Sequence, residues 1–469
     1  MSDFDLIIRG ASVVLPHGVD RLDLGLKDGI IAAMGTAVFG STDADLDASD
    51  FHVLPGLVDP HVHLNEPGRT DWEGFESGSR ALAAGGVTTY LDMPLHCSPP
   101  VVDRGGFLAK WNFGKASSLV DFGLWGGLTP ESLVHMQDLS DCGVIGFQAY
   151  LCDSGTDDFP LADDATLLEG MRRASDLAQI VAVHAENEGI TARLARRAVA
   201  GGRLSAADYL ASRPVIAELE AIQRAILFAW ETDCALHISS VSTARGIELV
   251  GQAKDQGLNI SCETCPHFLV LTEADTERLQ SLAKSAPPLR TPAEQSALWE
   301  QVSAGNVDMI VSAHSPAPPA AKQHAAHLFA AHAGIAGCQS RLALMLAAAD
   351  EDAHPVPLER MVEMLARNAA RRFRLSPRKG EIAVGADADL VIVSLNSGDE
   401  VRADALMYRY PEHSPYIGRH VRGKVLRTLL RGQTIYKDGR ISARPAAQFL
   451  RPAEDPAESF PAHPREEAA

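Results

Sequence analysis

The sequence predicts an α/β fold: a (β/α)8 barrel of the TIM type with a small composite β-sandwich domain built from both chain ends. Three observations lead to this prediction. Eight short apolar segments, each followed by a polar or helical stretch, fill the middle of the 469-residue chain. Further short strands with glycine turns stand before and after that middle. Finally, eight βα repeats favour a closed parallel barrel, whose active site lies at the carboxyl ends of the strands.

The domain boundaries follow from the positions of these segments. Residues 1–52 and 375–445 are expected to form one composite β domain, because a two-stranded piece at either end would be unstable alone. Residues 53–374 form the predicted barrel. Residues 446–469 are rich in Pro, Glu and Ala with few apolar anchors, so we expect a mostly disordered or loosely docked tail there.

The flanking strands alternate with turn residues. The predicted strands cover 6–14 and 24–32 at the start of the chain, and 388–393 and 426–432 near its end. Asp438-Gly439 is typical of a tight hairpin turn.

The barrel strands are predicted from short apolar runs, and the helices between them from apolar residues at steps of three or four. From Pro214 onward, for example, residues 215, 219, 222, 226 and 230 are apolar. The eight predicted strands are 53–58, 87–92, 120–125, 144–150, 180–184, 235–240, 258–262 and 308–312.

Composition excludes several classes of protein. The net charge of −19 argues against a nucleic acid or an anionic membrane as partner. No apolar run is long enough to span a membrane, and the start of the chain lacks a secretory signal pattern. The seven scattered cysteines are expected to be reduced thiols of a cytoplasmic protein. The close pair Cys262 and Cys265 lacks a second pair, so we interpret it as structural.

Two histidines follow the first predicted barrel strand. His61 and His63 stand two residues apart, so their side chains point the same way, into the barrel mouth. Two adjacent imidazoles suit a divalent metal of the zinc type. The alternative is a pair of unrelated histidines on a partly polar strand.

Further motifs decide between these alternatives. They lie at 55–63, 66–69, 72–75, 84–89, 92–94, 209–214, 262–268, 334–337 and 414–419. With these motifs, nearly the whole chain resembles the cyclic amidohydrolases, and among them the allantoinases more than the dihydroorotases or dihydropyrimidinases. The resemblance implies hydrolytic opening of a cyclic amide or ureide. It also implies two metals that share a hydroxide. A bound metal lowers the pKa of its water to about 7, so the hydroxide forms at neutral pH.

The ligand set that the resemblance implies is only partly present. The family uses a His-x-His pair, a carboxylated lysine that bridges the metals, two further histidines and an aspartate that also moves the proton. His61, His63 and His184 match this set. The lysine position is Gln148, the second single histidine position is Ser240 and the aspartate position is Ala313.

These replacements change the expected cofactor. Gln148 cannot become an anionic carbamate and Ala313 supplies no carboxylate, so two divalent ions about 3.5–4 Å apart would repel each other without screening. We therefore do not expect binuclear zinc. The expectation is one zinc or other divalent ion on His61, His63 and His184, or no metal.

Two further histidines stand near the changed positions. His237 stands three residues before Ser240 on the same predicted strand, so we expect it to pack behind the barrel and not to replace the missing ligand. No catalytic residue of the family set is intact. His314, beside Ala313, remains a candidate for catalysis.

Substrate contacts are implied by the resemblance as well. They are Gly334, Ile335, Ala336 and Gly337, which help to hold the ring in the family, together with His314. Ala286 stands where the family pattern has a serine, which puts part of the ring contacts in doubt.

Other histidines offer further alternatives. His96 could join a metal-free acid–base site, although it is individually more typical of a residue that lines a pocket. His324, His327 and His332 are spaced like one face of a helix and are interpreted as a solvated or loosely structured lid.

Three functional hypotheses remain. The chain is a divergent hydrolase of a cyclic ureide or amide, a catalytically silent paralogue that serves as a partner subunit, or a protein that binds or senses a small ligand in the old pocket. The expected partners are a small cyclic ureide or amide, and copies of the same chain or an active paralogue in an oligomer.

Overall fold

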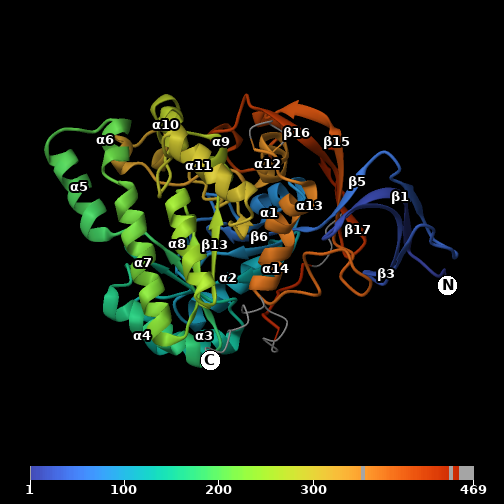
Figure 1. Ribbon diagram of the computed structural model, residues 1–469, viewed down its shortest axis with the longest axis horizontal. Helices are drawn as coiled ribbons and strands as arrows, with labels where there is room; N and C mark the ends of the chain where they lie inside the picture. Colours follow the sequence, from blue (N-terminus) through green and yellow to red (C-terminus); the bar gives the residue numbers. More distant parts are fainter. Residues whose placement is uncertain (1, 350–353, 443–446, 454–469) are drawn as a thin grey trace.

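The computed structural model describes residues 2–349, 354–442 and 447–453, and it contains a barrel beside a curved β domain (Figure 1). In Figure 1 strands from the start and from the end of the chain share that β domain. The predicted fold class is therefore confirmed.

The strands divide between two units. The β domain contains β1 (Leu6–Leu15), β2 (Gly18–Lys27), β3 (Ile30–Gly35), β4 (Asp45–Asp47), β5 (His52–Pro55), β15 (Leu390–Glu400), β16 (His420–Leu430), β17 (Gln433–Lys437) and β18 (Arg440–Ile441). The barrel contains β6 (Leu57–Val62), β7 (Val87–Asp92), β8 (Asp121–Leu124), β9 (Gly126–Gly127), β10 (Phe147–Tyr150), β11 (Ile180–His184), β12 (Ala235–Ser239), β13 (Ile260–Thr264) and β14 (Met309–Ile310).

Helices follow the barrel strands along the chain. They are α1 (Phe75–Ala84), α2 (Arg104–Ser117), α3 (Met136–Cys142), α4 (Asp164–Asp176), α5 (Glu188–Ala200), α6 (Ala206–Ala211), α7 (Val215–Thr232), α8 (Ala244–Asp255), α9 (Pro266–Val270), α10 (Glu273–Leu279), α11 (Pro292–Ser303), α12 (Arg341–Ala348), α13 (Leu358–Val362) and α14 (Asn368–Arg372). The predicted helix after Pro214 is α7, which buries Leu219 and Ile222.

The barrel closes through parallel contacts between its first and last strands. Val62, at the end of β6, forms a parallel bridge with His314, four residues beyond β14. The amide N–H of Ile145 donates to the carbonyl of Leu124 across the gap between β8 and β10. All other neighbouring strands pair in parallel, so the carboxyl ends of the strands meet at one mouth.

The first barrel strand begins later than predicted. The predicted strand 53–58 is divided between β5, which pairs with β15 in the β domain, and β6 in the barrel. The chain changes sheets at Gly56, where a Cβ atom would lie 2.1 Å from the Oγ1 atom of Thr88. Only glycine permits so close an approach. The apolar run therefore looked continuous although it serves two sheets.

The β domain is one sheet built from both ends of the chain, with a core of its own. Its order is β18-β17-β16-β15-β5-β1-β2-β3, with β4 beside β1. Residues from both chain ends share the core, among them Ile8, Leu24, Leu390 and Leu429. The predicted segment 24–32 is in fact a hairpin, because Asp28 and Gly29 both have positive φ and separate β2 from β3.

Part of the predicted tail is ordered. Phe449 contacts Phe107 and Phe122 with ring centroids 5.7 and 5.6 Å apart, and Leu450 is 3% exposed. The amide of Leu450 donates to the carbonyl of Phe122 on β8. Residues 447–453 are therefore docked against the barrel, and these few apolar side chains suffice to fix the segment there. Residues 454–469 lie outside the described residues.

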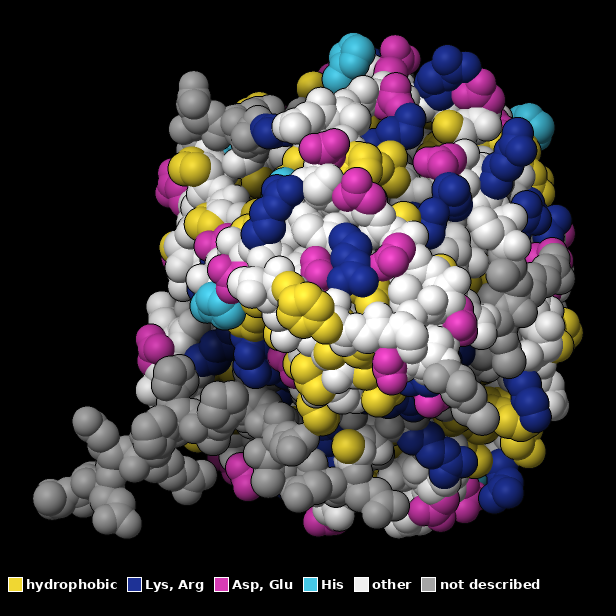
Figure 2. Space-filling model, turned by 90° about the vertical axis from the view of Figure 1, so that its right-hand side faces the viewer, with side chains coloured by type: hydrophobic (Ala, Val, Ile, Leu, Met, Phe, Trp, Pro, Cys, Tyr) yellow, Lys and Arg dark blue, Asp and Glu magenta, His cyan; other side chains and the backbone are white. Residues whose placement is uncertain are grey.

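The molecular surface mixes charges of both signs. Figure 2 shows acidic and basic side chains interspersed on the face that it presents. Among the described residues, no helix is both long and apolar enough to cross a membrane.

Candidate functional site in the barrel mouth

A cavity of about 480 Å³ opens beside the carboxyl ends of β10 and β11. Its volume is within the range of small-molecule sites. Its lining includes Trp72, His96, Tyr150, His184, Arg213 and Lys284. A second cavity, of about 570 Å³, lies at the opposite end of the barrel. Its lining includes Asn259 and Asp308, which come directly before β13 and β14. Barrel enzymes place their chemistry at the carboxyl ends, so the first cavity is the candidate site.

His61 and His63 lie side by side at the end of β6, as their spacing predicts. Their ring centroids are 5.4 Å apart, and both side chains are buried. The Nδ1 atom of His61 lies 2.5 Å from Oε1 of Glu263 on β13, which fixes the orientation of the ring. Burial lowers the pKa of His63 well below its usual range, so its imidazole is neutral and its nitrogen lone pair is available.

Glu263 connects several parts of the barrel interior. Its carboxylate contacts His61, lies 3.1 Å from Nε2 of His237, and accepts the amide N–H of Ser240 at 3.2 Å. Burial would raise the pKa of Glu263, but the charge and hydrogen bonds of His61 and His237 outweigh it and lower the pKa to about 2. Glu263 is therefore ionised.

His237 is not behind the barrel, and that prediction was wrong. Its ring lies inside, with Nδ1 2.8 Å from Oγ of Ser261 and Nε2 facing Glu263. The physical reason is the backbone of Ser240, whose φ of 55° ends the regular alternation of β12. Counting alternate residues back from Ser240 therefore places His237 on the wrong face of the strand. Because both nitrogens of His237 already have partners, the ring has no free donor atom for a metal.

Of the three positions that differ from the family set, Gln148 lies within β10, while Ser240 and Ala313 lie just beyond β12 and β14. Gln148 on β10 is fully buried, donates to the carbonyl of Ala149 at 3.2 Å and accepts the hydroxyl of Ser239 at 3.4 Å. Ser240 accepts the thiol of Cys265 at 3.7 Å. Ala313 follows β14 with a φ of 45°.

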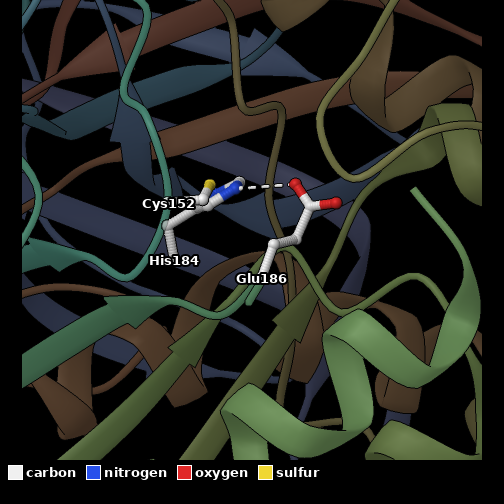
Figure 3. Close-up of side chains that lie close together, drawn as sticks. All are labelled: Cys152, His184 and Glu186. Atoms are coloured by element: carbon white, nitrogen blue, oxygen red, sulfur yellow. Dashed lines mark hydrogen bonds and ion pairs between the residues drawn. The ribbon is translucent and has the colours of Figure 1, made fainter. Parts of the chain in front are cut away.

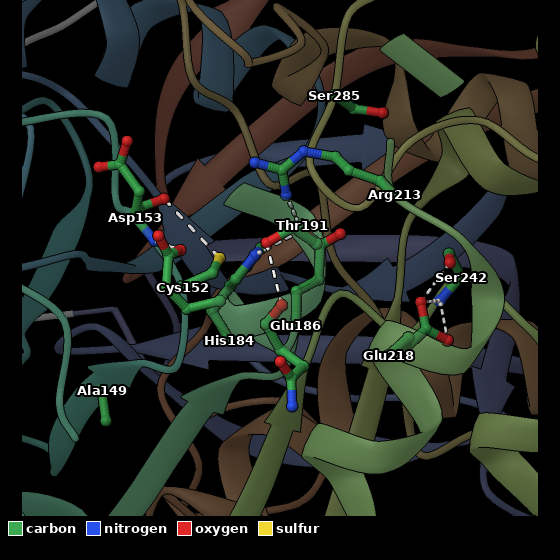
Figure 4. A network of polar contacts seen from close by, with 12 residues as sticks. Ala149, Cys152, Asp153, His184, Glu186, Thr191, Arg213, Glu218, Ser242 and Ser285 are labelled. Carbon is green, nitrogen blue, oxygen red and sulfur yellow. Dashed lines mark hydrogen bonds and ion pairs between the residues drawn. The ribbon is translucent and has the colours of Figure 1, made fainter. Parts of the chain in front are cut away.

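His184 belongs to a different group of side chains from His61 and His63. Its ring stacks on Tyr150 with centroids 4.5 Å apart, and its Nε2 lies 3.2 Å from Oε2 of Glu186 (Figure 3). Arg213 contacts the same carboxylate oxygen (Figure 4). Within the described ranges, the donor atoms of His184, Cys152 and Glu186 lie within 4.8 Å of one another, whereas His61, His63 and His184 form no such group.

His314 and the loop 334–337 are fixed beside the mouth. The ring of His314 is fully buried, its Nδ1 accepts the amide N–H of Gly337 at 3.2 Å, and its Nε2 lies 3.7 Å from Glu73. Gly334 donates to the carbonyl of Lys284 at 2.9 Å, while Ile335 and Ala336 are buried. His314 thus holds the end of β6 and this loop together.

The remaining histidines do not form one helical face. The segment between His324 and His332 contains one short 3-10 turn, Leu328–Ala330, so the helix-like spacing does not place the three rings on one helical face. His332 lies in the cavity wall, with ring centroids 5.0 Å from both Trp72 and His96. His96 in turn lies 4.6 Å from the ring of His63, and burial lowers its pKa to about 3.

The cysteines are free thiols in the structure. All seven are buried, including Cys262 and Cys265. Burial raises the pKa of Cys152 and of Cys265 well above the usual range, so neither is an ionised thiolate without a further partner.

Sequence reasoning missed Glu263, Cys152, Glu186 and Arg213 as parts of the site. A signal was present, since Cys152 stands two residues beyond Tyr150 and Glu186 two beyond His184. Tyr150 and His184 are partners in the parallel pair β10–β11. Both residues lie just beyond the strand ends, so their contact follows only once the register between β10 and β11 is known.

Comparisons with known proteins agree with this architecture. The sequence model described as "Amidohydrolase family" matches residues 52–435. The chain is 50% identical to a protein named allantoinase from Rubrobacter xylanophilus, over 98% of this chain and 100% of that protein. It is 48% identical to an allantoinase from Deinococcus radiodurans, over 96% and 99% of the two chains.

A solved structure shares the fold over nearly the whole length. The L-hydantoinase (dihydropyrimidinase) from Arthrobacter aurescens matches with a TM-score of 0.92 and 33% identity, covering 96% of this chain and 100% of that one. Both the barrel and the composite β domain are included in these matches. The chain therefore belongs to the amidohydrolase family, beside proteins named allantoinase and hydantoinase.

Proposed function

We propose that this protein binds a small cyclic ureide or amide in the barrel mouth and opens its ring by hydrolysis of a C–N bond, without the two-metal centre of its family. The similarity to allantoinases and to a hydantoinase supports the substrate class. A cavity of about 480 Å³ gives such a ring enough room.

The observation that carries the proposal is the identity of the residues at the three changed positions. The amide of Gln148 is neutral and hydrogen bonded, Ser240 lacks an imidazole, and Ala313 lacks a carboxylate. Two divalent ions would need the anions that these positions do not supply. The residues present therefore do not fit the family's metal pair.

The cavity supplies polar groups that suit a cyclic ureide. Such a ring presents carbonyl acceptors and N–H donors. Arg213 and Lys284 line the cavity as donors, and Tyr150 offers a flat surface for the ring. Buried His96 and His63 are held neutral by a lowered pKa, which makes both weak bases, and neither replaces an aspartate beside the attacking water.

The first test is metal content together with turnover. We expect fewer than two metals per chain after expression with zinc and dialysis against a weak chelator. We expect ring opening of a ureide, hydantoin or imide from a panel, at a rate about 10²–10⁴-fold below the Rubrobacter relative, since the general base is missing. Retention of two metals per chain would refute the proposal that the chain lacks the two-metal centre.

A triple variant tests whether the pocket is still competent. Gln148→Lys, Ser240→His and Ala313→Asp together restore the family set. We expect the variant to retain about two metals and to raise ring opening by at least the factor of about 10²–10⁴ that a general base contributes. If it binds two metals but opens no ring of the panel, the substrate contacts themselves have changed.

A second candidate function is a catalytically silent paralogue in an oligomer with an active relative. The absence of an acidic side chain at Ala313 favours it, because the proton-transfer group of the family is lost. This reading predicts ligand binding without turnover, and co-purification with an intact paralogue.

A further inference from the structure

Among the residues that the structure describes, four lysines are buried, and they fall into two groups. Lys110 and Lys379 contact buried aspartates, with the Nζ atoms 3.0 and 2.6 Å from the nearest carboxylate oxygens. Lys284 and Lys322 form no ion pair with a carboxylate of the described chain. A lysine is almost never fully buried unless its charge is paired, so these two lack a partner that the other two have.

Backbone carbonyls hold the two unpaired lysines in place. Nζ of Lys284 donates to the carbonyls of Phe329 and Ala331 at 3.1 and 2.5 Å, and Nζ of Lys322 donates to two further carbonyls. A carbonyl does not neutralise an ammonium, and a protonated amine has a third N–H group. Burial lowers the pKa of both lysines to about 7, which reflects the missing negative charge.

Of these two lysines, Lys284 lines the cavity in the barrel mouth. Its Nζ atom lies 4.8 Å from the ring centroid of Tyr209, and the guanidinium carbon of Arg213 lies 5.9 Å from the same centroid. Tyr209 and Arg213 also line the cavity. Lys322 is close behind, because burial and then the charge of Lys284 lower its pKa. One wall of the cavity is therefore positively charged.

The acidic groups around the cavity do not neutralise Lys284. Glu186 is already paired with Arg213. Asp153 is exposed, and its amide N–H donates to Oε2 of Glu188 at 2.9 Å. Burial lowers the pKa of Lys284 by more than the charge of Asp153 raises it. The negative charge that is missing beside Lys284 can therefore come from a ligand in the cavity.

A carboxylate is the anion that a cyclic ureide or amide can bring. It is carried as a substituent on the ring, or it forms when the ring opens. In ring opening, the oxygen of water adds to the carbonyl carbon, the C–N bond breaks and the nitrogen takes up a proton. The acid that results is ionised at neutral pH. An ammonium forms short, charge-assisted hydrogen bonds with a carboxylate, which are about twice as strong as neutral ones.

We propose that Lys284 binds a carboxylate of the ligand, carried by the ring or formed by its opening. The cavity then selects an anionic cyclic ureide, or the ring-opened acid, over neutral relatives of the same shape. This inference rests on the proposed ligand class, but it does not require turnover.

The test is calorimetric titration of the full chain at pH 7 with two matched pairs of probes. Hydantoin-5-acetate is compared with neutral hydantoin-5-acetamide, and hydantoate, the ring-opened acid of hydantoin, with its neutral amide. We expect the carboxylate of at least one pair to bind about 10–100-fold more tightly than the amide. Chromatography after each titration measures any hydrolysis separately.

Two variants show whether Lys284 causes this preference. Lys284→Met should abolish the preference and leave the affinity for the neutral amide unchanged, which also shows that the variant is folded. Lys115→Met is the control, because it removes the same charge from an exposed position on α2, and it should keep the preference.

The two pairs of probes identify the source of the carboxylate. A preference for hydantoin-5-acetate assigns the carboxylate to the ring, and a preference for hydantoate assigns it to the opened product. Equal affinities within both pairs would overturn the proposal, as would a preference that survives Lys284→Met. Absence of binding by all four probes would overturn it together with the ligand class. Binding that depends on Lys284 without any ring opening would count against the proposed hydrolysis alone.

Discussion

The backbone at Ser240 and Ala313 keeps a conformation that suits the side chains missing there. Their φ angles are 55° and 45°. Asp, Asn and His are several-fold enriched in this left-handed region relative to other non-glycine residues. Reintroduced His and Asp would therefore add no backbone strain. This is a physical reason to expect that the triple variant folds.

Two buried lysines beside the cavity give a pH dependence of stability. Burial lowers the pKa of Lys284 and of Lys322 to about 7. In the unfolded chain a lysine titrates near 10.4. Between about pH 7 and 10 the unfolded chain therefore binds more protons than the folded chain, so this contribution makes stability rise with pH.

The prediction is checked with urea unfolding from pH 7 to 9. The double variant Lys284→Met and Lys322→Met should show a smaller rise of the unfolding free energy with pH than the wild type. Replacing the exposed Lys115 by Met should keep the wild-type slope. Equal slopes in the double variant and the wild type would show that neither lysine is neutral in the folded chain.

Strand alternation predicted part of the site, and its failures have identifiable causes. Parity alone placed His61 and His63 together, and their ring centroids do lie 5.4 Å apart at the end of β6. It failed for His237, because the positive φ of Ser240 breaks the alternation. It could not find the contact of Cys152 with Glu186, because that contact depends on the register between two strands.

The ordered part of the tail contributes to the stability of the barrel. Leu450 is 3% exposed and its backbone pairs with Phe122 of β8. Leu450→Ala should lower the unfolding free energy by about 2–4 kcal/mol, because it leaves a cavity. Leu227→Ala on α7 is the control, since that side chain is 56% exposed and its loss should matter by less than about 0.5 kcal/mol. Equal urea midpoints for the two variants would contradict a stabilising role of the tail.

The two domains are joined by contacts that no sequence pattern revealed. Composition and turn residues predicted that the chain ends share a β domain, because short strands need partners. The exchange of sheets at Gly56 was missed, since it depends on the space beside Thr88. The ion pairs between domains were missed too, because they join residues more than 250 positions apart.

Lys379 is the centre of these ion pairs. Its Nζ atom lies 2.6 Å from Asp121 of β8, 2.8 Å from Asp387 and 2.7 Å from Asp389, and its side chain is 1% exposed. Burial lowers the pKa of Lys379, but the three carboxylates outweigh it and raise the pKa. Arg431 also binds Asp121. These cations occupy the space among the carboxylates, so this acidic group is structural and links the barrel to the β domain.

Lys379→Met should therefore destabilise the molecule strongly. Removing one partner of a buried ion pair costs about 3–5 kcal/mol, because the remaining charges stay buried. The difference in stability between the variant and the wild type should narrow as the pH falls and the carboxylates become protonated.

Lys424→Met is the control, because Lys424 pairs with Asp399 at a surface where both side chains are more than half exposed. Thermal unfolding of the three proteins at pH 7 and pH 5 checks the expectation. If Lys379→Met changes the melting temperature no more than Lys424→Met does, the two domains are held together by their apolar contacts and not by this charge cluster.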